Sequence, residues 1–217
     1  MLIAHYFTIS YLLCSIIFAI LDFSRFSWLR ISTMSNKSLS INLYIKCIPN
    51  VVINLILSMV STEYSYNLVK KNINLSYTYV IISLICYVIF ADAWFYFFHR
   101  IFHSNKYLYK TIHAHHHYYV EPFAFSGIEC HIIEHIFINI CSVLFGPFIC
   151  SFFGLLSLTS VRLWACLAGI TTCVTHSGYN MFNRAHFDHH LYLTGNYGLY
   201  PYISDKIFKT YKTNNKA

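Results

Sequence analysis

Charged residues are scarce in this chain. They make up 11% of its 217 residues, while 57% are hydrophobic and 19% are aromatic. A soluble domain of average composition carries about 25% charged residues, so the composition excludes an ordinary soluble protein and indicates an integral membrane protein. The net charge of +7 does not indicate nucleic-acid binding, because the chain has no basic helix and no pattern of basic and aromatic residues for that purpose.

Glycine and proline are also rare, with seven and four residues. No G-x-G-x-x-G motif is present, so we expect no nicotinamide or flavin site. No linker, repeat or low-complexity tract interrupts the chain, which predicts a single domain over residues 1–217. The eight cysteines include no C-x-x-C pair, and most lie in apolar segments. We interpret them as buried small hydrophobic residues rather than disulfide or zinc residues.

Long apolar runs are what the chain has instead. A membrane-spanning helix needs about 20 mostly apolar residues, and residues 2–21, 41–60, 76–98, 132–151 and 155–174 meet this requirement. The first segment reads as an uncleaved anchor, because no basic residue precedes it and no small-residue cleavage pattern follows it. We predict an all-α membrane bundle of four to five membrane segments with a cytosolic histidine-rich cap.

Basic residues suggest the orientation of the segments. They follow the first, third and fifth segments, at Arg25, Arg30, Lys37, Arg100, Lys106, Lys110, Arg184, Lys206, Lys209, Lys212 and Lys216. The loop after the second segment holds only Lys70 and Lys71. The positive-inside rule places the richer regions in the cytosol. Segments four and five form a full or re-entrant hairpin, so residues 99–135 and 176–190 can meet on one membrane face.

Most of the thirteen histidines fall into three short clusters. HRIFH contains His99 and His103, HAHHH contains His113, His116 and His117, and HFDHH contains His186, His189 and His190. On a helix, these spacings put the rings of each cluster on one face, and His115 points elsewhere. A lone histidine such as His5 is usually structural. Clustered imidazoles are costly to bury near lipid unless a metal takes their lone pairs, so we predict that these eight are metal ligands.

The donor set narrows the choice of metal. Imidazole suits zinc, copper, iron and nickel, but a structural zinc needs four ligands, commonly including cysteine. Eight imidazoles fit two metal ions with open positions, and two redox-active irons could hold dioxygen. A non-enzymatic metal store or transporter is the rival interpretation. Its loops usually carry irregular histidine runs, and acidic or histidine residues would recur inside the spans, which is not the pattern here.

Several motifs together resemble the membrane-bound fatty acid hydroxylase and sterol desaturase family. They are DAWFYFFHRIFH, YKTIHAHHHYYVEPFAF, HIIE, THSGY and HFDHHLYLTGNYGLYPYISDKIF, within residues 92–210. The resemblance implies that the eight clustered histidines hold two iron ions as a di-iron centre. It adds His176 of HSGY and His131 of HIIE as further ligands. It leaves His115 and His135 unassigned.

Two carboxylates lie beside these motifs. Asp92 precedes His99 by two helical turns, and Glu134 follows His131 by three residues. We expect each to accept the free N–H of a ligating imidazole and so fix its tautomer. Asp205 is expected to pair with a basic neighbour rather than to bind metal. The segment between HSGY and HFDHH is shorter than in most relatives, which predicts a reduced covering over the site.

The reaction implied by the resemblance is dioxygen-dependent hydroxylation or desaturation of a lipid C–H bond. A sterol or sterol-like lipid is the first expectation and a fatty acyl chain the second. An inactive relative is disfavoured because all three clusters are intact. Without a nicotinamide or flavin motif, electrons must come from outside, in such families usually from a cytochrome b5-type donor and its reductase. The expected location is the endoplasmic reticulum membrane, or that of the host for a viral protein, with the histidines facing the cytosol.

Overall fold

The protein is described from a computed structural model covering residues 2–24, 26–30, 39–69, 76–179 and 184–212. Within those ranges the chain is helical without a strand, and Arg30 and Tyr179 form an isolated antiparallel bridge. This confirms the predicted all-α class. The prediction of a shortened covering rested on a segment that lies mainly in residues 180–183, outside the described residues.

Five helices are long and apolar enough to cross a membrane. They are α1 (Ile3–Asp22), α2 (Ile41–Leu68), α3 (Tyr77–Ser104), the continuous run Ile132–Phe152, and α7 (Leu158–His176). The fourth consists of α5 (Ile132–Glu134), a π-helical turn η4 (His135–Ile140) and α6 (Cys141–Phe152). The five predicted segments are therefore confirmed. α3 runs six residues past the apolar segment that ends at 98, and His99 and His103 belong to this helix.

The outward faces of these helices suit a lipid environment. On α1, Leu13, Ile17 and Ile20 are each more than half exposed, and α2 and α3 expose isoleucines in the same way. Exposed aliphatic side chains of this density are unfavourable in water but match the hydrocarbon core of a bilayer. The apolar surface therefore supports insertion of all five helices.

Two glycines decide which helices touch. A Cβ on Gly169 of α7 would lie 2.8 Å from the carbonyl oxygen of Phe7 on α1, and one on Gly146 of α6 would lie 2.6 Å from Cα of Tyr87 on α3. Only glycine permits such close approach. α7 therefore packs mainly on α1, and α6 packs mainly on α3. α6 and α7, which follow each other in the chain, contact each other much less, and this leaves room between them.

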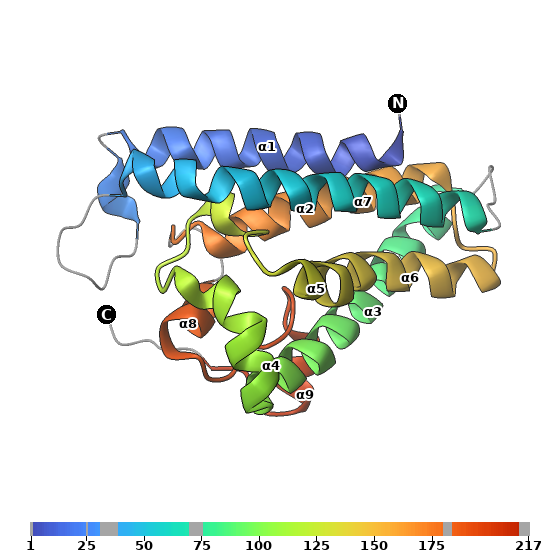
Figure 1. The fold of residues 1–217 in the computed structure, drawn as a ribbon. Helices are drawn as coiled ribbons and strands as arrows, with labels where there is room; N and C mark the ends of the chain where they lie inside the picture. The colour runs from blue at the N-terminus through green and yellow to red at the C-terminus, as the bar shows by residue number, and fades with distance from the viewer. Residues whose placement is uncertain (1, 25, 31–38, 70–75, 180–183, 213–217) are drawn as a thin grey trace.

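The remaining elements gather around the C-terminal end of α3, on the side away from α1 (Figure 1). They are α4 (Lys106–Thr111), the 3-10 helix η2 (His113–Tyr118), α8 (Ala185–Tyr192) and α9 (Ile203–Ile207); the short η1 (Ser27–Leu29) and η3 (Ala124–Ser126) lie nearer α1 and α2. Asn105 begins α4 as an N-cap, because its side-chain oxygen accepts from the amides of Tyr107 and Leu108. This histidine-rich region continues directly from the membrane helices.

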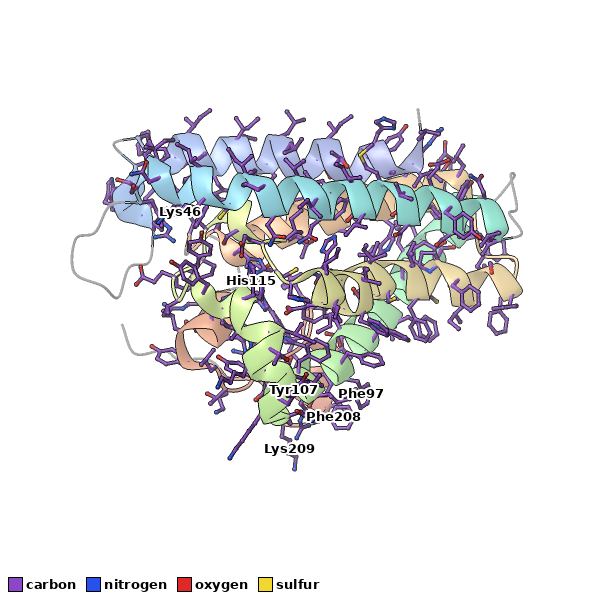
Figure 2. The ribbon with its side chains drawn as sticks, in the orientation of Figure 1. Lys46, Phe97, Tyr107, His115, Phe208 and Lys209 are labelled. Atoms are coloured by element: carbon purple, nitrogen blue, oxygen red, sulfur yellow. The ribbon has the colours of Figure 1, made fainter. Side chains whose placement is uncertain are left out.

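The side of the membrane that this region faces stays a prediction. Several of the basic residues behind it lie outside the described residues: Arg25, Lys37, Lys70, Lys71 and Lys216. Figure 2 shows Tyr107, Phe208 and Lys209 at the end of the molecule opposite α1.

Candidate metal centre

Nine imidazoles converge into two buried groups. The five-histidine group consists of His99, His103, His113, His117 and His189, and the four-histidine group consists of His116, His176, His186 and His190. In each group, one ring nitrogen per residue lies within 4.8 Å of all the others. All nine rings are buried except that of His103, which is half-buried. The fold thus brings together four separate stretches of chain.

The two H-x-x-H-H motifs are shared between the groups. His113 and His117 of the first motif enter the five-histidine group, while His116 enters the other. The second motif does the reverse, with His186 and His190 in the four-histidine group and His189 in the five-histidine group. The predicted single α-helical face is wrong for the first motif, because residues 113–118 form a 3-10 helix, which has three residues per turn. Each motif therefore contributes histidines to both groups.

Ring nitrogens in the five-histidine group lie so close together that hydrogen bonds between them cannot account for all the contacts. The Nε2 atom of His113 lies 2.8 Å from that of His103 and 3.0 Å from that of His117, and the latter two are 3.2 Å apart. An imidazole nitrogen carries either a hydrogen or a lone pair in the ring plane, never both. Among three mutually adjacent nitrogens, at least two therefore present the same kind of group. A cation between the rings removes this conflict.

In the four-histidine group, backbone carbonyls determine the tautomers. The Nδ1 atoms of His116 and His176 contact the carbonyl oxygens of Glu129 at 3.2 Å and Thr172 at 2.8 Å. A carbonyl can only accept, so both Nδ1 atoms carry hydrogen and both Nε2 atoms carry lone pairs. These two Nε2 atoms face each other at 3.4 Å. Opposed lone pairs in a buried site are repulsive, and a metal ion is the group that accepts both.

Three members of the five-histidine group are oriented in the same way. Nδ1 of His99 donates to the carbonyl of Tyr197 and Nδ1 of His189 to that of Gly195, each at 2.7 Å. Nδ1 of His113 lies 2.9 Å from a carboxylate oxygen of Glu134, as a close contact rather than a well-aligned hydrogen bond. Nε2 of His189 is buried, and no described residue is its hydrogen-bond partner. Such outer contacts are those expected of metal-ligating histidines.

Burial keeps these rings neutral. It lowers the pKa of His113, His117, His186, His189 and His190 well below the usual histidine value, and neighbouring imidazoles lower it further. Burial also lowers the pKa of His116. Neutral imidazole is the form that binds metal. The donor set is therefore ready for metal at neutral pH, and its all-nitrogen character fits iron.

Asp92 orients a loop rather than an imidazole, which corrects the sequence-based prediction. Its carboxylate accepts from the amides of Leu199 at 2.9 Å and Ser204 at 2.7 Å. Asp205 accepts from the amides of Tyr197 and Gly198, at 2.9 and 2.6 Å, and forms no ion pair with a basic residue in the part of the chain that the structure describes. Together the two carboxylates hold the loop whose Tyr197 carbonyl receives His99. Asp92 therefore acts on His99 indirectly, by holding the backbone of this loop. The predicted contact of Glu134 with a clustered imidazole is present at His113.

Of the ten predicted ligands, His131 is the one that the structure places outside both groups. It begins α5 as an N-cap, and its Nδ1 accepts from the amide of Ile133 at 3.2 Å. A ring nitrogen that caps a helix in this way faces its own backbone, so the residue's position is explained without metal. The sequence-based inclusion of His131 is therefore not supported by its placement.

The two unassigned histidines have other partners. His115 lies next to α2 (Figure 2), where its Nε2 is 3.0 Å from a Glu129 carboxylate oxygen and 3.4 Å from Nδ2 of Asn50. The hydrogen bond with the Glu129 carboxylate raises the pKa of His115. His135 bonds to α2 inside the bundle. Glu129 was missed from the sequence, because it acts on His116 through a backbone carbonyl that no side-chain motif can reveal.

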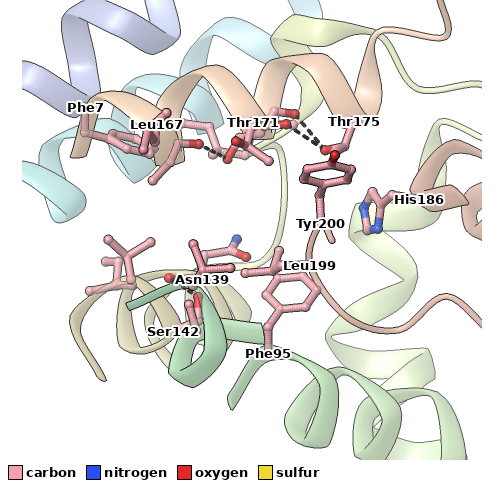
Figure 3. Close-up of a pocket in the computed structure, with 18 of the residues that line it drawn as sticks. Phe7, Phe95, Asn139, Ser142, Leu167, Thr171, Thr175, His186, Leu199 and Tyr200 are labelled. Carbon is pink, nitrogen blue, oxygen red and sulfur yellow. Dashed lines mark hydrogen bonds between the residues drawn. The ribbon is translucent and has the colours of Figure 1, made fainter. Parts of the chain in front are cut away.

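An apolar cavity of about 450 Å³ opens against the four-histidine group. It lies between α7 on one side and α3 with η4 and α6 on the other (Figure 3). Its walls include Phe95, Val143, Trp164 and Ala168, and three of its lining residues are His116, His176 and His186. The volume falls within the range of about 300–1,000 Å³ usual for small-molecule sites. No member of the five-histidine group lines it.

Comparisons with known proteins identify the family to which the chain is similar. The family model described as fatty acid hydroxylase matches residues 84–210. The chain is 31% identical to fatty acid hydroxylase ahd1 of Mycosarcoma maydis over 91% of this chain and 54% of that protein. It is 29% identical to a putative methylsterol monooxygenase of Dictyostelium discoideum over 96% of this chain and 82% of that protein.

A third relative is the fatty acid hydroxylase domain-containing protein 2 of Macaca fascicularis, with 27% identity over 65% of this chain and 44% of that protein. The chain therefore spans about half the length of several relatives that it matches. No solved structure matches the chain.

Proposed function

Because the chain belongs to the fatty acid hydroxylase family, we propose that it is a membrane-bound, iron-dependent oxidoreductase that uses dioxygen to hydroxylate or desaturate a lipid C–H bond. The nine converging histidines would hold two iron ions, one in each group. When bound, the iron supplies the activation of dioxygen needed to oxidise an unactivated carbon.

The observation that carries this proposal is the cavity that ends at the four-histidine group. His116, His176 and His186 line an otherwise largely apolar space between membrane helices. A lipid in that space would present its C–H bonds to one group of imidazoles and would exclude water from it. A metal store or transporter has no need of such a cavity, so the enzyme interpretation is favoured over that rival.

The residues of the chain have distinct tasks in this account. The nine imidazoles bind the metals, and Glu129, Thr172, Gly195 and Tyr197 hold their ring orientation through backbone carbonyls. Asp92 and Asp205 stabilise the loop that carries Tyr197. Phe95 and the side chains of α7 aim the lipid at the four-histidine group. Positioning of the reacting carbon is the main contribution that the protein makes itself.

The substrate we favour is a sterol or sterol-like lipid, with a fatty acyl chain as the alternative. Relatives of the chain carry both kinds of name, a methylsterol monooxygenase and a fatty acid hydroxylase. We propose an external electron donor of the cytochrome b5 type, with its reductase. We also propose residence in the endoplasmic reticulum membrane with the histidine groups on the cytosolic side, in keeping with the positive-inside rule.

The test is lipid profiling of a sterol-desaturase-deficient host that expresses the chain, with iron and oxygen supplied. We expect a new hydroxylated or desaturated lipid, lost in anaerobic culture. Both His116→Ala and His189→Ala should abolish this product, since each removes a ligand from a different group, while the amount of protein in the membrane stays the same. Continued product formation in both variants would overturn the ligand assignment. An unchanged lipid profile, alongside full iron loading, would count against the reaction.

A further inference from the structure

Three polar side chains in the wall of the cavity form a hydrogen-bonded cluster that the metal groups do not explain. On its η4 and α2 walls, inside the membrane segments, lie His135, Asn139 and Ser58. η4 is a π-helical turn, a rare geometry that is often found at functional sites. Polar side chains within membrane helices are costly and usually functional. These three residues therefore need a reason to line a space built for lipid.

The hydrogen bonds of His135 fix its tautomer. Its Nε2 lies 2.8 Å from the backbone carbonyl oxygen of Asn54 and 2.8 Å from Oγ of Ser58. A carbonyl oxygen can only accept, so Nε2 carries the hydrogen and Nδ1 carries a lone pair. The Asn54 carbonyl thus makes Nδ1 of His135 a hydrogen-bond acceptor.

That acceptor in turn sets the direction of the Asn139 carboxamide. The Nδ2 group of Asn139 lies 3.3 Å from Nδ1 of His135 and 3.4 Å from Sγ of Cys130. With its nitrogen held there, the carboxamide turns Oδ1 the other way, and Figure 3 shows the Asn139 side chain reaching into the cavity. Among the described residues, no hydrogen bond involves this oxygen. A half-buried acceptor in apolar surroundings without a donor is unfavourable.

From this geometry we infer that Asn139 is a specificity-determining residue, which accepts a hydrogen bond from a hydroxyl group of the lipid in the cavity. The favoured ligand is therefore a lipid alcohol, and a lipid without a donor at that point binds less well. Ser58 can add to the same recognition, because its oxygen accepts from His135 and its hydroxyl donates to no other described residue. The inference rests on the proposed function for the identity of the cavity as the substrate site.

Binding to the purified full-length chain in lipid nanodiscs tests this without turnover. The probes are two matched pairs, cholesterol with its 3-O-methyl ether and hexadecanol with its methyl ether. The wild-type chain should bind the alcohol of at least one pair about three- to ten-fold more tightly than the ether, as one hydrogen bond allows. Asn139→Leu, which keeps the shape but removes the acceptor, should bring that ratio to about one, with ether binding unchanged.

Ser142→Ala is the matched control, because this residue also lines the cavity but its hydroxyl already bonds to the backbone carbonyl of Asn139. It should keep the alcohol preference. Asn139→Ala repeats the comparison in case leucine prevents folding, and retained ether binding demonstrates an intact cavity in either variant. An alcohol preference that survives both Asn139 variants, or its absence from the wild type in both pairs, would overturn the inference.

Failure of the proposed function would look different. A chain that oxidises no lipid, yet shows an Asn139-dependent alcohol preference, contradicts the reaction and leaves the binding site standing. A chain that oxidises lipids equally well with and without a hydroxyl, in wild type and Asn139→Leu alike, contradicts the specificity and leaves the reaction standing. The pair that shows the preference also separates a sterol substrate from a long-chain alcohol.

Discussion

The two histidine groups differ in what surrounds them. The four-histidine group borders the cavity, whereas the five-histidine group does not line it, includes the half-buried His103, and packs against the rings of Phe102, Tyr109 and Tyr197. A metal with four protein ligands keeps more open positions than one with five. The comparison indicates a division of labour, in which the four-histidine group faces the lipid and the five-histidine group completes the pair of metals.

Removal of a cavity-facing ligand is the change expected to have the largest effect. His186→Ala leaves three imidazoles in the four-histidine group, two of them beside the cavity, so product formation should fall below detection and iron content should drop by about one ion per chain. His103→Ala removes the one half-buried ring of the five-histidine group and keeps its four buried imidazoles, so this variant, unlike His189→Ala, should retain measurable activity. Product yield and iron analysis of both variants provide the measurement. Equal loss in the two variants would contradict the division of labour.

Acidification should release metal from both groups. Burial lowers the pKa of His113, His186 and His190 in the folded chain, while an unfolded chain takes up protons near pH 6.5. Since the unfolded state binds more protons below that value, the free energy of unfolding falls as the pH falls and is constant above it. Proton competition for the ligands acts in the same direction.

Iron retained after dialysis, and the thermal unfolding temperature, should therefore decrease together from about pH 6.5 downwards and stay level between pH 7 and 8.5. His5→Gln, which removes an imidazole distant from both groups, should give the same profile as the wild type. A chain that becomes more stable as the pH falls below 6.5 would show that the clustered imidazoles are not held neutral.

Asp92→Asn tests the loop that orients His99 and is expected to have an intermediate effect. The substitution weakens the bonds to the amides of Leu199 and Ser204, so iron affinity or activity should fall about 10–100-fold, as for other outer contacts of metal ligands. Glu63→Gln, at the far end of the bundle next to the Ile3 amide, is the control and should leave activity unchanged. Wild-type activity in Asp92→Asn would show that the loop holds its place without this carboxylate.

His131→Ala should have the smallest effect. The ring caps a three-residue helical turn, and loss of such a cap costs about 1 kcal/mol of stability. Iron content should stay at the wild-type level, as determined by metal analysis of purified protein. Loss of one iron ion would return His131 to the ligand set.

Much of the fold could be predicted from local pattern alone. The five spans follow from the length of apolar runs, and the three clusters follow from histidine spacing, because both features depend on residues close together in the chain. The apolar segment ends at 98 although α3 continues to Ser104, because the last turns of the helix carry His99, Arg100 and His103 and are no longer uniformly apolar. Neighbouring residues decide these properties, so sequence is enough to find them.

The division of the histidines between two groups could not be read in the same way. Whether His116 or His117 faces a given group depends on the 3-10 geometry of η2 and on where α8 packs. The role of Asp92 depends on amides more than 100 residues away in the chain. Backbone carbonyls, such as those of Glu129 and Thr172, leave no mark on residue type. Tertiary contacts decide these features, and a single sequence does not reveal which residues will be in contact.

The number of iron ions per folded chain tests the central claim most directly. Protein purified from iron-supplied cells should contain about two iron ions per chain by metal analysis, and His186→Ala and His117→Ala should each contain about one. A wild-type chain that holds a single ion, or holds zinc without iron and consumes no dioxygen, would contradict the account of two histidine groups that together form an iron centre.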